Sequence, residues 1–130
     1  MLPAVMTLTG SFPERADASA RSTFDGTVTI TNTTARRIAA LSASQPDVYV
    51  KQAGAVVAAP VPRDDVGLVL DLAPGEARSL IATGSLRRCD DPAAPLPPGR
   101  YEVHAVLRFA DMESAVGGPW ELEIGAIGDD

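Results

Sequence analysis

One segment constrains the fold of this chain more than any other, because in residues 97–109 a tight turn leads into a long alternating run. Apolar side chains occupy every second position there. They are Tyr101, Val103, Ala105, Leu107 and Phe109, and the positions between them include Glu102, His104 and Arg108. A period of two over this length is the signature of a strand with one face in a core and the other in water. The segment therefore predicts a half-buried strand that follows a Pro-Gly turn.

The first apolar residue of this strand also indicates how the sheets pack. A tyrosine close behind such a turn is typical of the late strand of immunoglobulin-like sandwiches, where its hydroxyl bonds back to the connecting backbone. We therefore expect the Tyr101 hydroxyl to bond a backbone group upstream of it in the chain.

Other apolar runs recur at nearly regular intervals, with Gly, Pro or Asn between them, as in all-β domains. The strands predicted from them are 4–9, 24–32, 38–43, 47–51, 56–58, 66–72, 78–86 and 120–124. Residues 11–21 are predicted to be a polar connection, 32–34 a turn and 112–119 a hairpin-like loop. The run 35–43 is too short and too poorly capped for a helix. The pattern predicts an all-β, immunoglobulin-like Greek-key β-sandwich of two antiparallel sheets with about 7 to 9 strands.

With 130 residues, the chain is long enough to bury one core without disulfides. We predict one domain over 1–130, with the core in 24–126 and with 1–23 forming the first strand and a polar connection. The side chains predicted to fill the core lie on the apolar faces of the runs. They are Phe24, Val28, Ile30, Leu70, Leu72, Leu80, Tyr101, Val103, Leu107, Trp120, Leu122 and Ile124.

The charge of the chain argues against two classes of partner. The formal net charge is −6 at pH 7, and the 11 Lys and Arg residues are scattered along the sequence. A surface that binds nucleic acid or an anionic membrane needs clustered basic residues. We therefore expect no nucleic-acid partner and no membrane insertion, and the sequence leaves the oligomeric state open.

The compartment also stays open. No run of about 20 apolar residues is present, and the first residues lack the basic start and apolar stretch of a signal peptide. The chain is therefore either cytoplasmic, or extracytoplasmic with its export signal removed.

Residues that could support catalysis or metal binding are few. His104 is the one histidine, and no Gly-x-Ser-x-Gly motif supplies a nucleophile for it. Cys89 is the one cysteine and is either a reactive thiol beside two arginines or an incidental residue. The acidic pairs 64–65 and 90–91 are either calcium ligands or solvated loop residues, and they lack the spacing of a calcium loop. We expect no enzyme, no cofactor and no metal site.

The candidate partner-binding surface is the segment 87–97, in the longest irregular stretch of the chain. It contains adjacent arginines in an acidic protein, and it overlaps the excursion 89–98, whose four prolines reduce the entropy lost on binding. The predicted partner-binding residues are Arg87, Arg88, Cys89, Pro95 and Leu96. The other interpretation is that the stretch is filler that packs over the end of the sandwich.

The order of these motifs resembles a known family. The chain contains Phe24-x-Gly-x-Val-x-Ile-x-Asn32, Asp47-Val-Tyr-Val50 before a Gly-centred turn, and Leu72-x-Pro-Gly-Glu76. It then contains Leu96-x-Pro-Gly-x-Tyr101-x-Val-x-Ala105 and a closing strand. In this order the motifs resemble the BsuPI-type intracellular proteinase inhibitor family of bacterial immunoglobulin-like domains.

The resemblance implies a non-catalytic domain that binds protein, with inhibition of a serine protease as the namesake activity. A trypsin-like protease would then accept Arg87 or Arg88 in its specificity pocket. The alternative function is a structural or accessory immunoglobulin-like domain of a bacterial cell-envelope or exported protein.

Overall fold

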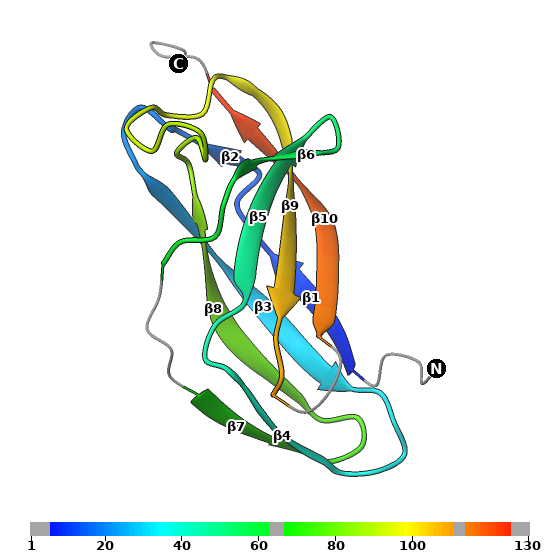
Figure 1. Ribbon diagram of the computed structural model, residues 1–130. Coiled ribbons are helices and arrows are strands. Elements are labelled where there is room, and N and C mark those ends of the chain that lie inside the picture. The colour runs from blue at the N-terminus through cyan, green and yellow to red at the C-terminus, as the bar shows by residue number, and fades with distance from the viewer. Residues whose placement is uncertain (1–5, 63–66, 111–113, 126–130) are drawn as a thin grey trace.

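A computed structural model of the chain describes residues 6–62, 67–110 and 114–125. These residues form ten strands and no helix that is long and apolar enough to cross a membrane (Figure 1). The strands are β1 (Met6–Ser11), β2 (Arg15–Ala16), β3 (Thr23–Asn32), β4 (Ile38–Ala43), β5 (Asp47–Gln52), β6 (Ala55–Ala58), β7 (Gly67–Leu72), β8 (Ala77–Ser85), β9 (Gly99–Leu107) and β10 (Ala115–Ile124). The predicted all-β class is confirmed.

The strands are divided among three sheets. One sheet has the order β1-β3-β8, the second has the order β2-β10-β9-β5-β6, and β4 pairs with β7 alone. All pairings are antiparallel except the short one between β2 and β10. The sequence predicted two antiparallel sheets, and the structure adds the separate β4–β7 pair. The β4–β7 pair lies at the end of the molecule away from the β5–β6 hairpin (Figure 1).

The core lies between the two larger sheets. Of the side chains predicted to fill it, all are buried except Trp120, which is half-buried. The Trp120 indole packs against the Phe12 ring, 5.0 Å between centroids, and over Gly10. Tryptophan is large and is rarely buried completely, so a half-buried position is common for it.

Strand β10 begins earlier than the sequence predicted. Residues 115–119 belong to the strand instead of a loop, while 112 and 113 lie outside the described residues. The register with β9 shifts between Gly117 and Trp120, so an irregularity absorbs the Gly-Gly-Pro segment within the strand. A Cβ atom at Gly117 would lie 2.7 Å from the Leu8 carbonyl oxygen, so glycine is what lets β1 approach β10 there.

The predicted tyrosine corner is confirmed. Tyr101 is 4% exposed, and its hydroxyl donates a hydrogen bond to the carbonyl oxygen of Pro97. Burial raises the pKa of Tyr101 above its usual range, because the charged phenolate is less well solvated than the neutral phenol. The corner therefore ties the start of β9 to the irregular stretch before it.

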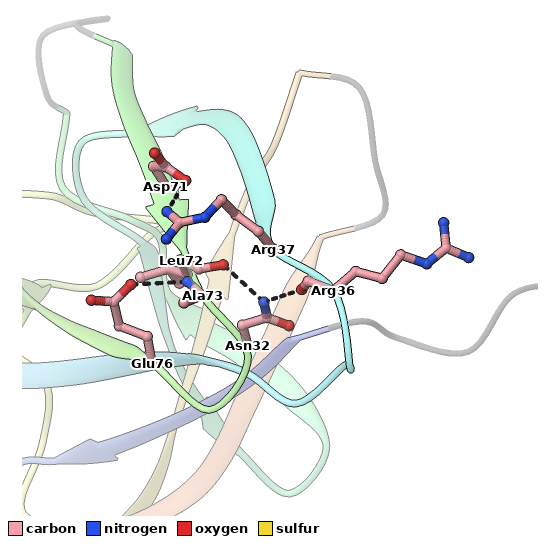
Figure 2. A network of polar contacts seen from close by, with 7 residues as sticks. All are labelled: Asn32, Arg36, Arg37, Asp71, Leu72, Ala73 and Glu76. Atoms are coloured by element: carbon pink, nitrogen blue, oxygen red, sulfur yellow. Dashed lines mark hydrogen bonds and ion pairs between the residues drawn. The ribbon is translucent and has the colours of Figure 1, made fainter.

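A buried asparagine joins two connections at the opposite end of the sandwich. Asn32 is 0% exposed, and its Nδ2 donates to the carbonyl oxygens of Arg36 at 2.7 Å and Leu72 at 2.9 Å (Figure 2). Its Oδ1 accepts bonds from the backbone nitrogen and the hydroxyl of Thr34. The side chain thus uses both donors and its acceptor to hold the β3–β4 connection against the end of β7.

Candidate functional site

The candidate surface is the excursion of residues 86–98, which joins β8 to β9. Two buried leucines anchor it: Leu86 is 0% exposed and Leu96 is 3% exposed. Their backbones are bonded as well, since the Leu96 nitrogen donates to the Leu86 carbonyl oxygen at 2.8 Å and the Leu86 nitrogen donates to Ser22 at 2.9 Å. The excursion therefore leaves the core at Leu86 and returns to it at Leu96.

Between these anchors the backbone folds into successive turns. The Arg88 nitrogen donates to the Ala94 carbonyl oxygen at 3.0 Å, which closes the base of the tip. Inside it, the Asp91 nitrogen donates to Arg88 at 3.3 Å and the Ala94 nitrogen donates to Asp91 at 2.9 Å. We call residues 88–95 the tip. Its internal bonds give it a defined conformation instead of an extended one.

The two arginines have different environments. The Arg88 guanidinium binds the Asp90 carboxylate with two bonds, Nε to Oδ1 at 2.9 Å and Nη2 to Oδ2 at 2.7 Å. This contact lowers the pKa of Asp90. Arg87 is half-buried, and its Nη1 donates to the Ala93 carbonyl oxygen at 3.3 Å. Arg88 is thus the more exposed cation, and Arg87 helps to hold the conformation of the tip through its bond to Ala93.

Cys89 connects the tip to β6. Its backbone nitrogen donates to the Val57 carbonyl oxygen at 2.9 Å, and its Sγ lies 3.6 Å from the Val56 carbonyl oxygen. The residue is exposed, and its sulfur is a free thiol. The main contribution of Cys89 to the fold is therefore its backbone bond.

The other two predicted partner-binding residues separate. Pro95 is exposed on the tip, whereas Leu96 is buried and belongs to the core. A buried side chain cannot contact a partner, so Leu96 is corrected from a surface residue to an anchor. The sequence did not predict that Leu96 is buried, because it lies between prolines and outside any alternating apolar run.

His104 was expected to face solvent, but the structure places it in a more enclosed position. Its side chain is 22% exposed, and Nε2 lies 3.6 Å from Oε1 of Glu102. Nε2 is buried and has no hydrogen-bond partner among the described residues. Arg108, on the same face, binds Asp47 at 2.7 Å and the Tyr49 hydroxyl at 3.1 Å. No nucleophile is therefore hydrogen-bonded to the imidazole in the part of the chain that the structure describes.

An open groove beside β2 was not predicted from the sequence. Side chains of both charge signs and three aromatic residues line it, among them Phe12, Arg15, Arg100, Glu102, Trp120 and Glu121. Glu102 and Glu121 are register partners on neighbouring strands. Within the described ranges, no three His, Cys, Asp or Glu residues gather closely enough to hold a metal ion. The mixed charges select no single class of ligand.

Comparisons with known proteins assign no family. No family model matches the sequence, and no curated protein matches it.

Solved structures share the fold at low sequence identity. The CARDB domain of a Pyrococcus furiosus protein, solved in complex with di-metal ions, aligns over 93% of this chain and 93% of that domain, with 12% identity and a TM-score of 0.51. A β-glucosidase from Listeria innocua in complex with glucose aligns over 93% of this chain, with 17% identity and a TM-score of 0.50. The aligned region is only 16% of the β-glucosidase, so this chain resembles one part of a much longer protein. The chain is an all-β, immunoglobulin-like domain similar to a CARDB domain.

Proposed function

We propose that this domain is a non-catalytic protein-binding module that contacts its partner through the tip, residues 88–95. The observation that supports this proposal is the combination of exposure and internal order at the tip. Arg88, Cys89 and Pro95 are exposed there, while the backbone beneath them is closed by hydrogen bonds and anchored by two buried leucines.

The order of the tip favours binding for an energetic reason. Association costs about 0.5–1.5 kcal/mol for each flexible side chain that becomes immobile, and loop ordering adds to this cost. A tip that is already folded in the free protein avoids most of the backbone part. Arginine and proline also suit such a surface, because a guanidinium offers several donors in a fixed plane and proline adds stiffness.

The absence of catalysis is part of the proposal. General base catalysis needs a nucleophile or substrate proton within hydrogen-bond reach of the base. His104 Nε2 has no hydrogen-bond partner among the described residues, and Oε1 of Glu102 lies 3.6 Å from it. The groove beside β2 supplies carboxylates, but their neighbours Lys51 and Arg100 make it a surface of mixed charge.

Proteinase inhibition is the narrower form of this proposal, and it rests on the resemblance to the BsuPI-type family. Arg88 is the residue that a trypsin-like pocket would accept, since it is exposed and Arg87 is half-buried. Arg88 would first have to leave Asp90, and its backbone is folded into a turn by the bond from Asp91. A structural or accessory role in a larger exported protein is the alternative function.

Crosslinking from the tip tests the proposal directly. Cys89 is the one cysteine of the chain, so a maleimide photocrosslinker placed there reports contacts of the tip alone. The matched control is the Cys89→Ser, Ser79→Cys variant, labelled at an exposed position near the start of β8, whereas the tip follows the end of that strand. We expect one protein species to crosslink at Cys89 and not at residue 79. Arg88→Ala should reduce its yield, whereas Arg15→Ala, which removes another exposed ion-paired arginine, should not.

The outcomes separate the two forms of the proposal. Crosslinks of equal yield and identity at both positions would refute a tip interface. A specific crosslink to a serine protease, with loss of its activity at micromolar protein, would support the inhibitor form. A specific crosslink to any other protein, without inhibition across a serine-protease panel, would support the binding module and exclude the inhibitor.

A further inference from the structure

The outer edge of β7 is a second surface, at the end of the sandwich that carries the β4–β7 pair (Figure 1). β7 pairs with β4 over six consecutive positions without a register shift. No other strand of the described structure pairs with it. A regular edge strand presents unpaired backbone donors and acceptors, which together form a template for another strand.

Hydrogen bonds on the far side of β4 show which backbone groups of β4 face β7. The Ala43 nitrogen donates to the Arg108 carbonyl oxygen at 3.0 Å, and the Ala110 nitrogen donates to the Leu41 carbonyl oxygen at 2.9 Å. Successive residues of a strand direct their backbone groups to opposite sides. Ser42, which lies between Leu41 and Ala43, therefore directs its N–H and C=O toward β7.

The register transfers this orientation to β7. Ser42 lies opposite Leu68, so the backbone groups of Leu68 point toward β4. Those of Gly67, Val69 and Asp71 point toward the open edge. No backbone hydrogen bond to these three residues occurs across that edge among the described residues.

The side chains around this edge do not protect it. Natural edge strands are shielded by lysine, proline or bulges, and β7 has none of these. Its one charged residue, Asp71, is neutralised by Arg37 at 2.8 Å. Val69 is 65% exposed and lies opposite Leu41, which is 48% exposed. The apolar pair of Val69 and Leu41 is thus exposed to solvent beside the unpaired backbone donors and acceptors of the β7 edge.

We propose that β7 pairs with β7 of a second copy of this chain, antiparallel about a two-fold axis, to form a continuous four-stranded sheet β4-β7-β7-β4. The occupant is a second copy because the edge is self-complementary, as a two-fold interface requires. When the outward backbone groups meet, Val69 lies opposite Val69 of the second copy. Gly67 then lies opposite Asp71 of the second copy, so no like charges oppose each other.

This register also extends the exposed apolar pair. Leu41 and Val69 of one copy continue into Val69 and Leu41 of the other, so four apolar side chains form one row across the new sheet. Cross-strand apolar pairs of this kind stabilise a sheet. Two six-residue strands make an interface smaller than the roughly 1,000 Å² of a stable complex, so we expect weak, concentration-dependent association.

Introducing like charges at the two-fold axis tests the proposal. In Val69→Lys, two lysines would oppose each other across the axis, and in Val69→Glu two glutamates would do so. The control is Ile81→Lys, which places the same charge at a position that is 64% exposed on another edge strand, β8. Sedimentation velocity from low micromolar to submillimolar concentration reports the mass, and thermal melts confirm that each variant is folded.

We expect the wild-type mass to rise with concentration from 13.5 kDa toward twice that value. Each Val69 variant should associate at least about tenfold more weakly, because like charges directly opposite destabilise the pairing. An equimolar mixture of Val69→Lys and Val69→Glu should associate again, and Ile81→Lys should behave as wild type. A monomeric wild type, loss of association in Ile81→Lys, or no recovery in the mixture would each overturn the proposal.

Discussion

Replacing Asn32 by alanine should destabilise this domain far more than the loss of one surface amide would. The substitution removes the two bonds that Nδ2 donates to Arg36 and Leu72 and the two that Oδ1 accepts from Thr34. The Leu72 contact is buried, and the others are partly buried. Each buried group left without a partner costs about 1–3 kcal/mol. Water can reach the part-buried groups, so we expect a loss of about 2–4 kcal/mol in total.

The measurement is urea unfolding followed by far-UV circular dichroism. A lower midpoint with an unchanged slope would report a loss of stability in the folded state alone. The control is Gln52→Ala, because the exposed Gln52 amide makes one bond to the Arg100 carbonyl oxygen at 3.2 Å and should matter by less than about 0.5 kcal/mol. If Asn32→Ala lost less than about 1 kcal/mol, the network would not hold the two connections together.

Three further predictions concern the tyrosine corner and the Leu96 anchor of the excursion. Tyr101→Phe removes the bond to the Pro97 carbonyl oxygen and should cost about 1 kcal/mol by the same urea measurement, and an unchanged midpoint would exclude a role for the corner. Because the folded pKa of Tyr101 is raised, the unfolded state loses its proton first, so wild-type stability should fall as pH rises above about 10. The fall should be shallower in Tyr101→Phe, and equal slopes would contradict this assignment. Leu96→Ala should cost about 2–5 kcal/mol because it empties part of the core, whereas Pro95→Ala next to it should change stability little; equal effects would contradict the anchor.

The parts of the fold that were predictable from sequence are those set by local periodicity. The run of alternate apolar residues in β9 identifies its buried face, and the turn before it identifies the tyrosine corner. The same reasoning located β3, β5 and β8 to within a few residues. In each case one face of the strand packs on the core, so the alternation of apolar and polar side chains shows where the strand runs and which of its faces is buried.

The parts that were not predictable depend on contacts between distant segments. Asn32 has the sequence context of a turn residue. Its role in joining the β3–β4 connection to β7 depends on Leu72, which lies 40 residues away in the sequence. Leu96 lies among prolines and becomes an anchor because the chain returns to the core there. The Gly-Gly-Pro segment has the composition of a loop, but the neighbouring strands hold it within β10. Of the candidate surface, the sequence located the stretch but not which of its side chains are exposed.

The placement of the first and last long strands has a mechanical consequence. β1 begins beside the end of β3, with Met6 opposite Asn32, and β10 ends beside the start of β9, with Ile124 opposite Gly99. These two points lie at opposite ends of the sandwich (Figure 1). A tensile force applied between them would act along β1 and β10, across ladders whose hydrogen bonds run perpendicular to the strands. The bonds of each ladder would then be sheared together instead of opening one at a time, so the domain should resist a force applied between these two points more strongly than one that peels a strand away.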